Sequence, residues 1–417
     1  MLRPLYWALL VPLALLGTAL TQKKPLLARL WLLAVSLLFL WWAQPALWPL
    51  TLLMALLAWA LPRWGRRGAA WYAALAVLLL AGLKIGRVPW PMGLSFVLLQ
   101  GIAYGMDVTG GKTAPGTLTD TLTYLTFFPK LPAGPLARFD SFRESRVRLG
   151  AENLERGMTL MIAGLGRKLL LADNLRPLAM AAFSGDAHPL AWALSLAGCG
   201  LYVYHDFAGA TEMARGVALM LGIGLPENFD RPFSALSLRD FWRRWHMSLS
   251  GFLRDYLYIP LGGSRKGMPR TLLNLMAVFL VMGLWHGFTW PFLVFGLWHG
   301  ALVALEHAGV IRPSRWPRIL ARVYTLAAVL MGFLVFMAPD MGRLFGGVSV
   351  SFAARQQVFA LLSPLSLGAL GLGAALPWLP RVSCPAWLRR LGLLLLLILC
   401  YAHLFAAGYA PLLYAQF

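Results

Sequence analysis

The 417-residue chain has few charged residues and very few cysteines. Only 13% of its residues are charged and 59% are hydrophobic, which is far more apolar than a soluble globular protein. Its three cysteines, Cys199, Cys384 and Cys400, show neither the pairing of a disulfide framework nor the spacing of a metal site. The sequence therefore predicts an integral membrane protein without a metal centre.

Acidic residues are the scarcer charged class. The 16 Asp and Glu residues face 37 Lys and Arg residues, which gives a net charge of +21. In a soluble protein this excess would suggest a nucleic acid partner. In an apolar chain it fits cationic loops on the cytoplasmic side of a membrane. We therefore expect the lipid bilayer and an anionic cytosolic ligand as partners, and no nucleic acid.

The motifs of the familiar soluble enzymes are also missing. The sequence has no G-x-S-x-G elbow, no phosphate-binding P-loop, no H-E-x-x-H metal pair and no dinucleotide-binding glycine fingerprint. It gives no support for an acyl-enzyme intermediate on serine or cysteine.

Long apolar runs are abundant instead. A spanning helix needs about 20 mostly apolar residues, and the runs predict an all-α, polytopic membrane protein with roughly ten to twelve crossings, because several runs are short enough to be re-entrant. We divide the chain into N-terminal transmembrane helices at 1–115, a central part with interfacial and re-entrant segments at 116–310, and C-terminal transmembrane helices at 311–417.

The central part has features that a simple membrane helix lacks. Residues 124–139 contain three prolines and cannot form one continuous helix. The stretch 229–270 contains eight basic and three acidic residues, a net charge of +5. Ser237 and Asp240 form a helix-capping pattern. They predict a helix that ends near Pro260, with an apolar stripe and a neighbouring face shared by these three residues: Arg239, Arg243 and His246. Such a helix lies in the membrane interface.

Two histidines occupy unusual positions. The pentapeptide GLWHG occurs twice and places His286 and His299 in apolar segments, where an ionisable side chain is a candidate functional residue. A neutral imidazole with one hydrogen-bond partner is also a common structural residue. Thr289, Trp290 and Pro291 predict a break between two helices, with one histidine near a site and the other used for packing.

Four segments together resemble the membrane-bound O-acyltransferase family. They are residues 201–267, with RPFSALSLRDFWRRWHMSLSGFLRDYLYIPLGG near the end; 283–290, GLWHGFTW; 127–139, FFPKLPAGPLARF; and 164–175, GLGRKLLLADNL. Within the family they resemble the bacterial branch of alginate O-acetylation proteins and D-alanyl transfer proteins of teichoic acid synthesis. The resemblance implies helices around a central tunnel and acyl transfer from a cytosolic thioester to an external hydroxyl.

The resemblance also implies site residues. His286 matches the catalytic histidine of the family and His246 matches the second histidine at the site, whereas His299 does not match the catalytic position. His205 departs from the aromatic residue usual before Asp-Phe. The motif positions without an assigned individual role are Asn228, Arg254, Asp255 and Tyr256.

The expected chemistry agrees with these residues. An imidazole is the usual acceptor for the proton of an attacking hydroxyl, so His286 would be the general base, with His246 orienting a substrate or assisting proton movement. The basic stretch, including Arg243, Arg244 and Arg254, would bind a phosphate-bearing donor. This donor is acetyl-coenzyme A or a phosphopantetheinyl carrier protein, and we expect no bound cofactor.

Several functional alternatives remain open at this stage. We favour acetylation of an exported polysaccharide or of a periplasmic or membrane partner protein in the bacterial inner membrane. D-alanyl transfer to teichoic-acid-like or other cell-envelope acceptors is the alternative. A transporter would also contain interrupted helices, but the interruptions here cluster in one central region without a matching set in a second half. A scaffold without activity would not need His286.

Overall fold

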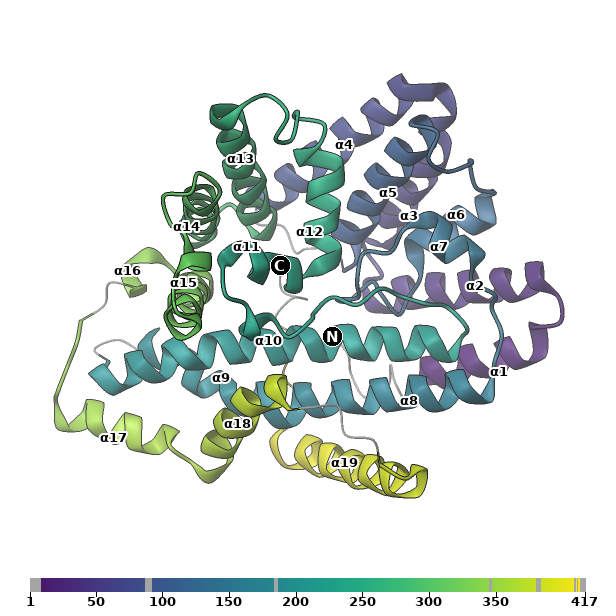
Figure 1. The fold of residues 1–417 in the computed structure, drawn as a ribbon. Coiled ribbons are helices and arrows are strands. Elements are labelled where there is room, and N and C mark those ends of the chain that lie inside the picture. The colour runs from purple at the N-terminus through teal and green to yellow at the C-terminus, as the bar shows by residue number, and fades with distance from the viewer. Residues whose placement is uncertain are drawn as a thin grey trace. The chain divides into compact units, whose positions relative to one another are not determined.

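The computed structural model is helical in nearly all of the residues that it describes, which are 9–86, 92–183, 187–344, 347–379, 384–408, 410 and 412 (Figure 1). These residues contain no strand, only two isolated backbone bridges. The all-α fold predicted from the apolar runs is confirmed. The chain divides into two compact units, which are described separately.

The first unit contains residues 1–165, 210–227 and 411–417. Its helices are α1 (Val11–Thr21), α2 (Pro25–Ala43), α3 (Trp48–Ala60), α4 (Gly65–Ile85), α5 (Leu94–Thr109), α6 (Leu118–Thr126), α7 (Phe139–Glu144), most of α8 (Ala151–Gly166) and the last part of α10 (Pro189–Met220), with a short 3₁₀ turn at Leu61–Trp64. Helix α2 packs on α1 and α6, and α5 packs on α3 and α4. Gly157 of α8 faces the backbone of Gly216 of α10, because a Cβ on Gly157 would lie 2.6 Å from the Gly216 carbonyl oxygen. Small residues at this crossing therefore let two helices approach closely.

The proline-rich segment of this unit is irregular, as the sequence predicts. Helix α6 ends at Thr126 and the next helix starts at Phe139. Between them the backbone turns, and Phe127, Phe128 and Lys130 are fully buried. Irregular backbone is stable in a membrane protein where protein surrounds it.

The second unit contains residues 166–209 and 228–410. It includes the first part of α10 and these elements: the π-helical turns Arg167–Ala172 and Arg254–Tyr258, α9 (Asp173–Met180), α11 (Leu238–Arg244), α12 (Met247–Leu253), α13 (Met268–His286), α14 (Trp290–His307), α15 (Arg318–Met337), α16 (Met341–Leu344), α17 (Phe352–Leu361), α18 (Pro364–Ala375) and α19 (Ala386–Ala407). Four short 3₁₀ turns lie at Ala181–Phe183, Pro232–Ser234, Pro313–Arg315 and Leu376–Trp378. Helices α13 and α14 begin with a proline in their first turn, where the missing N–H costs no helical hydrogen bond.

Five helical segments among the described residues are long and apolar enough to cross a membrane. They are Pro25–Ala43, Trp48–Ile85, Met268–His286, Arg318–Met337 and Ala386–Ala407. The pair Phe352–Leu361 and Pro364–Trp378, bent by 63°, makes a sixth if it forms one span. The protein is therefore a multi-pass membrane protein.

These five or six spans are fewer than the ten to twelve crossings that the sequence predicts. The apolar runs at 189–206 and 208–224 could each form a span by sequence alone, but they are largely one continuous helix, α10 (Pro189–Met220). Two further apolar helices, α1 and α5, have 11 and 16 residues within the described part of the chain, and a spanning helix needs about 20. The central tunnel and the three-part division at residues 116 and 311 stay predictions.

Candidate active site

The predicted interfacial helix is broken at His246, which is the main departure from the sequence interpretation. The capping pattern is confirmed, because the Ser237 side chain accepts a hydrogen bond of 3.1 Å from the Asp240 N–H. However, α11 ends at Arg244 and a new helix begins at Met247. His246 has φ 44° and ψ 51°, a left-handed conformation that only Arg231 shares among the described non-glycine residues. The continuous helix to Pro260 is therefore wrong.

Asn228 explains this break. Its backbone oxygen accepts a hydrogen bond of 3.0 Å from the Met247 N–H, and its side-chain oxygen accepts one of 3.1 Å from the Ser248 N–H. Both N–H groups are in the first turn of α12, where no helical partner exists. Asn228 thus caps α12 through a residue 20 positions later in the chain, Ser248, and holds the turn that carries His246.

The break also changes the environment of His246. Its side chain is only 3% exposed, and its ring lies 4.6 Å from the ring of Phe207. The sequence places His246 on one face with Arg239 and Arg243, but those two side chains are exposed and line a cavity. Burial lowers the pKa of His246 to about 3, because a charged imidazole loses its hydration there. His246 is therefore neutral at physiological pH.

His286 is the last residue of α13, and the helix break predicted after it is confirmed, since α14 starts at Trp290. The His286 side chain is 5% exposed, and its ring lies 4.9 Å from the Phe336 ring of α15. The ring of Trp285 lies near both candidate histidines. Its ring centroid is 4.7 Å from that of His286 and 6.4 Å from that of His246.

Glycines fix the position of His286. A Cβ on Gly283 would lie 2.3 Å from the Phe292 carbonyl oxygen, and a Cβ on Gly296 would lie 2.6 Å from the Phe279 carbonyl oxygen. The backbones of α13 and α14 therefore touch at both positions, which side chains larger than glycine would prevent. Gly283 therefore serves the close packing of α13 against α14.

A cavity of about 660 Å³ lies between residues of α11, α12, α13 and α14, and neither His246 nor His286 is among the described residues that line it. Its polar wall has no acidic residue and includes Arg239, Arg243, Arg254 and His307. Its apolar wall includes Met247, which follows His246, and Met282, which lies one helical turn before His286. The cavity thus combines arginine side chains with an apolar wall, and two residues of that wall are close in sequence to the candidate histidines.

The other predicted donor-binding residues are placed differently. Arg244 does not line this cavity, because its guanidinium bonds Asp240 at 3.0 Å and Asp230 at 3.5 Å. Asp255 does not line it either, and its carboxylate pairs with Arg254 at 2.7 Å. Tyr256 is 9% exposed and packs on the Phe252 ring at 5.0 Å.

The remaining two histidines of interest are packed inside the second unit. The His299 ring is fully buried near Trp242 and Phe295, at ring distances of 5.1 and 4.8 Å. Its Nε2 would be 2.2 Å from a Cβ on Gly332. The Nε2 of His205 lies 2.9 Å from the Gly373 carbonyl oxygen, which accepts a hydrogen bond. Both environments are those of structural histidines.

Sequence reasoning did not assign Trp285, Met247 or Met282 to the site. Each is adjacent to a candidate histidine in the chain or on the helix face, so helical spacing is a usable signal for them. Arg239 carries a clearer signal, because it lies four residues before Arg243 on the predicted polar face.

Comparison with known proteins gives the same family as the motifs. The family model of the membrane-bound O-acyltransferases matches residues 113–341. A probable alginate O-acetylase of Pseudomonas putida is 34% identical over 78% of this chain and 75% of its own length. One of Azotobacter vinelandii is 36% identical over 60% of this chain and 51% of its own length, so the chain spans about half of that relative. A teichoic acid D-alanyltransferase of Bacillus subtilis is 28% identical over 59% of this chain and 68% of its own length.

Proposed function

Because the chain belongs to the membrane-bound O-acyltransferase family, we propose that it transfers an acyl group from a cytosolic thioester to an external hydroxyl. The acyl group is acetyl in this proposal, and the acceptor is an exported polysaccharide or a partner protein. The site of action is the bacterial inner membrane. The P. putida and A. vinelandii relatives, both named as alginate O-acetylases, favour acetyl over other groups.

One observation carries the proposal: two buried imidazoles lie near the ring of Trp285, in the same unit as a cavity whose wall has three arginines. The guanidinium groups of Arg239, Arg243 and Arg254 suit the phosphates of coenzyme A or of a phosphopantetheine arm. The apolar wall with Met247 and Met282 suits the uncharged chain that ends in the thioester. A donor bound in this way would direct its acyl group toward the histidines.

The proposed reaction is direct transfer. His286 accepts the proton of the acceptor hydroxyl, and the hydroxyl oxygen forms a bond with the thioester carbonyl carbon. The carbon–sulfur bond then breaks, and the departing sulfur takes the proton from the imidazolium to leave as a thiol. Neutral His246 would accept or orient a hydrogen bond to the substrate during this step.

The test is thiol release from acetyl-coenzyme A by the full chain in nanodiscs, with and without a soluble alginate oligomer as acceptor. We expect His286→Ala to lower turnover by about 10²- to 10⁴-fold, which is the usual contribution of a general base. The matched control is His188→Ala, which removes an imidazole whose Nδ1 accepts a hydrogen bond from the nearby Leu190 N–H at 3.2 Å and which does not line the cavity. Equal rates for the two variants would show that His286 is not the base.

D-alanyl transfer from a carrier protein is the second candidate, because the cavity wall has three arginines and no acidic residue. An acidic carrier would be attracted to such a surface. The same assay separates the two candidates when acetyl-coenzyme A is replaced by a D-alanyl carrier-protein thioester. Turnover with the carrier alone would favour D-alanyl transfer, and loss of that turnover in His286→Ala would place both reactions at one site.

A further inference from the structure

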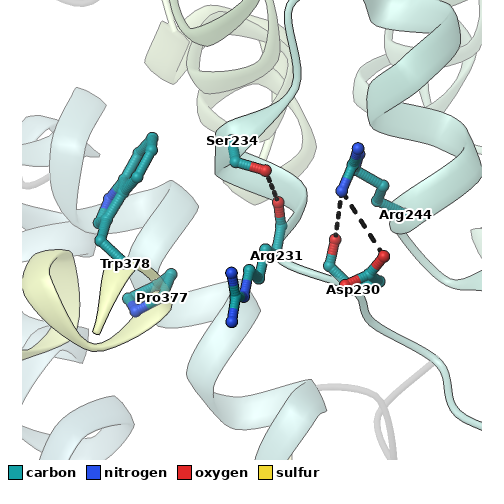
Figure 2. A pocket seen from close by; sticks show the side chains of 6 residues that line it. All are labelled: Asp230, Arg231, Ser234, Arg244, Pro377 and Trp378. Carbon is teal, nitrogen blue, oxygen red and sulfur yellow. Dashed lines mark hydrogen bonds and ion pairs between the residues drawn. The ribbon is translucent and has the colours of Figure 1, made fainter. Parts of the chain in front are cut away.

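A second pocket of about 430 Å³ lies apart from the proposed donor cavity and shares no lining residue with it. The residues that line it are Asp230, Arg231, Ser234, Arg244, Pro377 and Trp378. Figure 2 shows the Arg231 side chain on the side of Pro377 and Trp378, pointing away from the ion pair of Asp230 and Arg244. Nothing in the acyl-transfer proposal uses this pocket.

Arg231 is held there by an unusual backbone. Its φ of 45° lies in the left-handed region, which is uncommon for a residue with a Cβ. Ser234 stabilises this conformation, because both its N–H, at 3.0 Å, and its hydroxyl, at 2.7 Å, donate to the Arg231 carbonyl oxygen. Backbone strain of this kind persists where the fold fixes a side chain in one place.

The charges around the pocket leave a positive surplus. The carboxylates of Asp230 and Asp240 are both paired with Arg244. Among the residues that the structure describes, no carboxylate pairs with the guanidinium of Arg231 or of Arg322. The Arg322 guanidinium lies 4.9 Å from the centre of the Trp378 ring. Among the described residues, Arg231 shares the pocket with Trp378 and Arg322 lies over the Trp378 ring, and neither arginine is paired with a carboxylate.

The pocket is also at the end of two candidate membrane spans. Trp378 is the last residue of the bent helix pair Phe352–Leu361 and Pro364–Trp378. Arg322 is in the first turns of the span Arg318–Met337. Tryptophan and arginine at span ends lie at the level of the lipid headgroups. A ligand in this pocket would thus be at the membrane surface.

We propose that Arg231 and Trp378 form a binding site for a phosphate ester at the membrane surface, occupied by the headgroup of an anionic phospholipid. The guanidinium of Arg231 donates hydrogen bonds to the phosphate oxygens, and the Ser234 hydroxyl holds the backbone turn that positions Arg231. Trp378 packs against the glycerol region, and Arg322 adds positive charge next to it. A phosphate ester of a soluble molecule has the same chemistry and is the competing source.

The test measures phosphatidylglycerol binding to the full chain in detergent by native mass spectrometry. The variant Arg231→Gly removes the guanidinium, and glycine adopts the left-handed backbone without strain, so the turn is retained. We expect binding to weaken by about fivefold, the usual effect of one basic residue near an anionic membrane. The matched control is Arg156→Ala, which removes an exposed arginine paired with Glu152 at 3.2 Å.

The three possible outcomes distinguish a lipid site, a site for a soluble phosphate ester and no site at Arg231. Equal phosphatidylglycerol binding by Arg231→Gly and Arg156→Ala would overturn the proposal. Displacement of the lipid from the wild type by equimolar coenzyme A would assign the site to a soluble phosphate ester and overturn the lipid as occupant. About fivefold weaker lipid binding in Arg231→Gly than in Arg156→Ala, with no displacement by coenzyme A, is the result that we expect.

Discussion

At the scale of single residues, His246 combines a buried imidazole with a left-handed backbone. These two properties can be separated by substitution. Glycine adopts the same backbone at no cost and removes the ring, whereas asparagine tolerates the backbone and keeps a polar group. Substitution of His246 by glycine or asparagine therefore tests the role of the imidazole while the turn between α11 and α12 is kept.

We expect His246→Gly to lower thiol release by about a hundredfold, at the lower end of contributions to proton transfer. We expect His246→Asn to retain more turnover than His246→Gly if the ring orients the substrate through a hydrogen bond. Both variants should bind the donor with unchanged affinity, because His246 does not line the cavity. A wild-type rate in His246→Gly would contradict the assigned role.

The same residue gives a pH dependence of stability. Burial lowers the pKa of His246 to about 3 in the folded protein, and the unfolded value is about 6.5. The folded state is therefore stabilised above pH 6.5, and this stability is lost as the pH falls from 6.5 toward 3. At pH 5 the wild type should therefore have lost about 2 kcal/mol of folding stability that His246→Asn keeps. Thermal unfolding of both proteins in nanodiscs measures this difference.

The residues of the site differ in how far the sequence predicts them. His286 and His246 are recognisable from the short motifs GLWHG and RRWHMSLS. The burial of His246 is not predictable from helical periodicity, because Asn228 ends one helix and caps the next from a distant part of the chain. Long-range side-chain capping of this kind has no local signature.

At the scale of elements, the contact between α13 and α14 sets the position of His286. We expect Gly283→Ala to destabilise the protein by about 2 kcal/mol, because the added methyl group would be forced into the Phe292 carbonyl oxygen 2.3 Å away. Thermal unfolding measures the loss, and thiol release should fall with it as His286 moves. Gly392→Ala is the matched control, since nothing lies within 4 Å of its new methyl group. A neutral or stabilising Gly283→Ala would show that the two helices separate without cost.

A buried ion triad joins three further elements. The ammonium of Lys168, in the π-helical turn Arg167–Ala172, lies 2.7 Å from the carboxylates of Asp173 in α9 and Asp206 in α10. All three side chains are at most 8% exposed. Lys168 is the cation that both carboxyl groups share, so it is the group that keeps them together.

We expect Lys168→Met to cost about 3–5 kcal/mol, because it leaves two carboxylates facing each other without their cation. The loss should appear as a lower melting temperature. Arg156→Ala breaks an exposed pair and should cost less than about 1 kcal/mol. Similar melting temperatures for both variants would mean that water reaches the triad.

At the scale of the whole molecule, composition predicts the class of protein better than the number of its spans. Apolar content alone identifies a helical membrane protein, since the bilayer leaves few other choices. The number of crossings is harder to predict, because apolar runs do not distinguish separate spans from one long helix such as α10 or from a bent pair such as α17 and α18. Tertiary packing decides that difference, and hydropathy does not record it.

With a net charge of +21, the anionic donor could be attracted by the total charge of the protein or by the arginines of the cavity wall alone. Two variants with the same change in net charge separate these effects. Arg243→Glu reverses a charge on the cavity wall, and Arg156→Glu reverses an exposed charge that does not line the cavity. Both lower the total charge by the same amount.

We expect Arg243→Glu to raise the KM for acetyl-coenzyme A by about tenfold, because it replaces a charge-assisted hydrogen bond with repulsion. Arg156→Glu should leave KM within about twofold of the wild type. Raising the ionic strength from 0.05 M to 0.5 M should reduce the difference between the two variants, since salt screens an exposed charge.

Equal increases in KM would mean that the donor is attracted by the field of the whole cationic surface. An increase confined to Arg243→Glu would mean that the arginines of the cavity bind the donor themselves, and the general excess of positive charge would then serve membrane orientation.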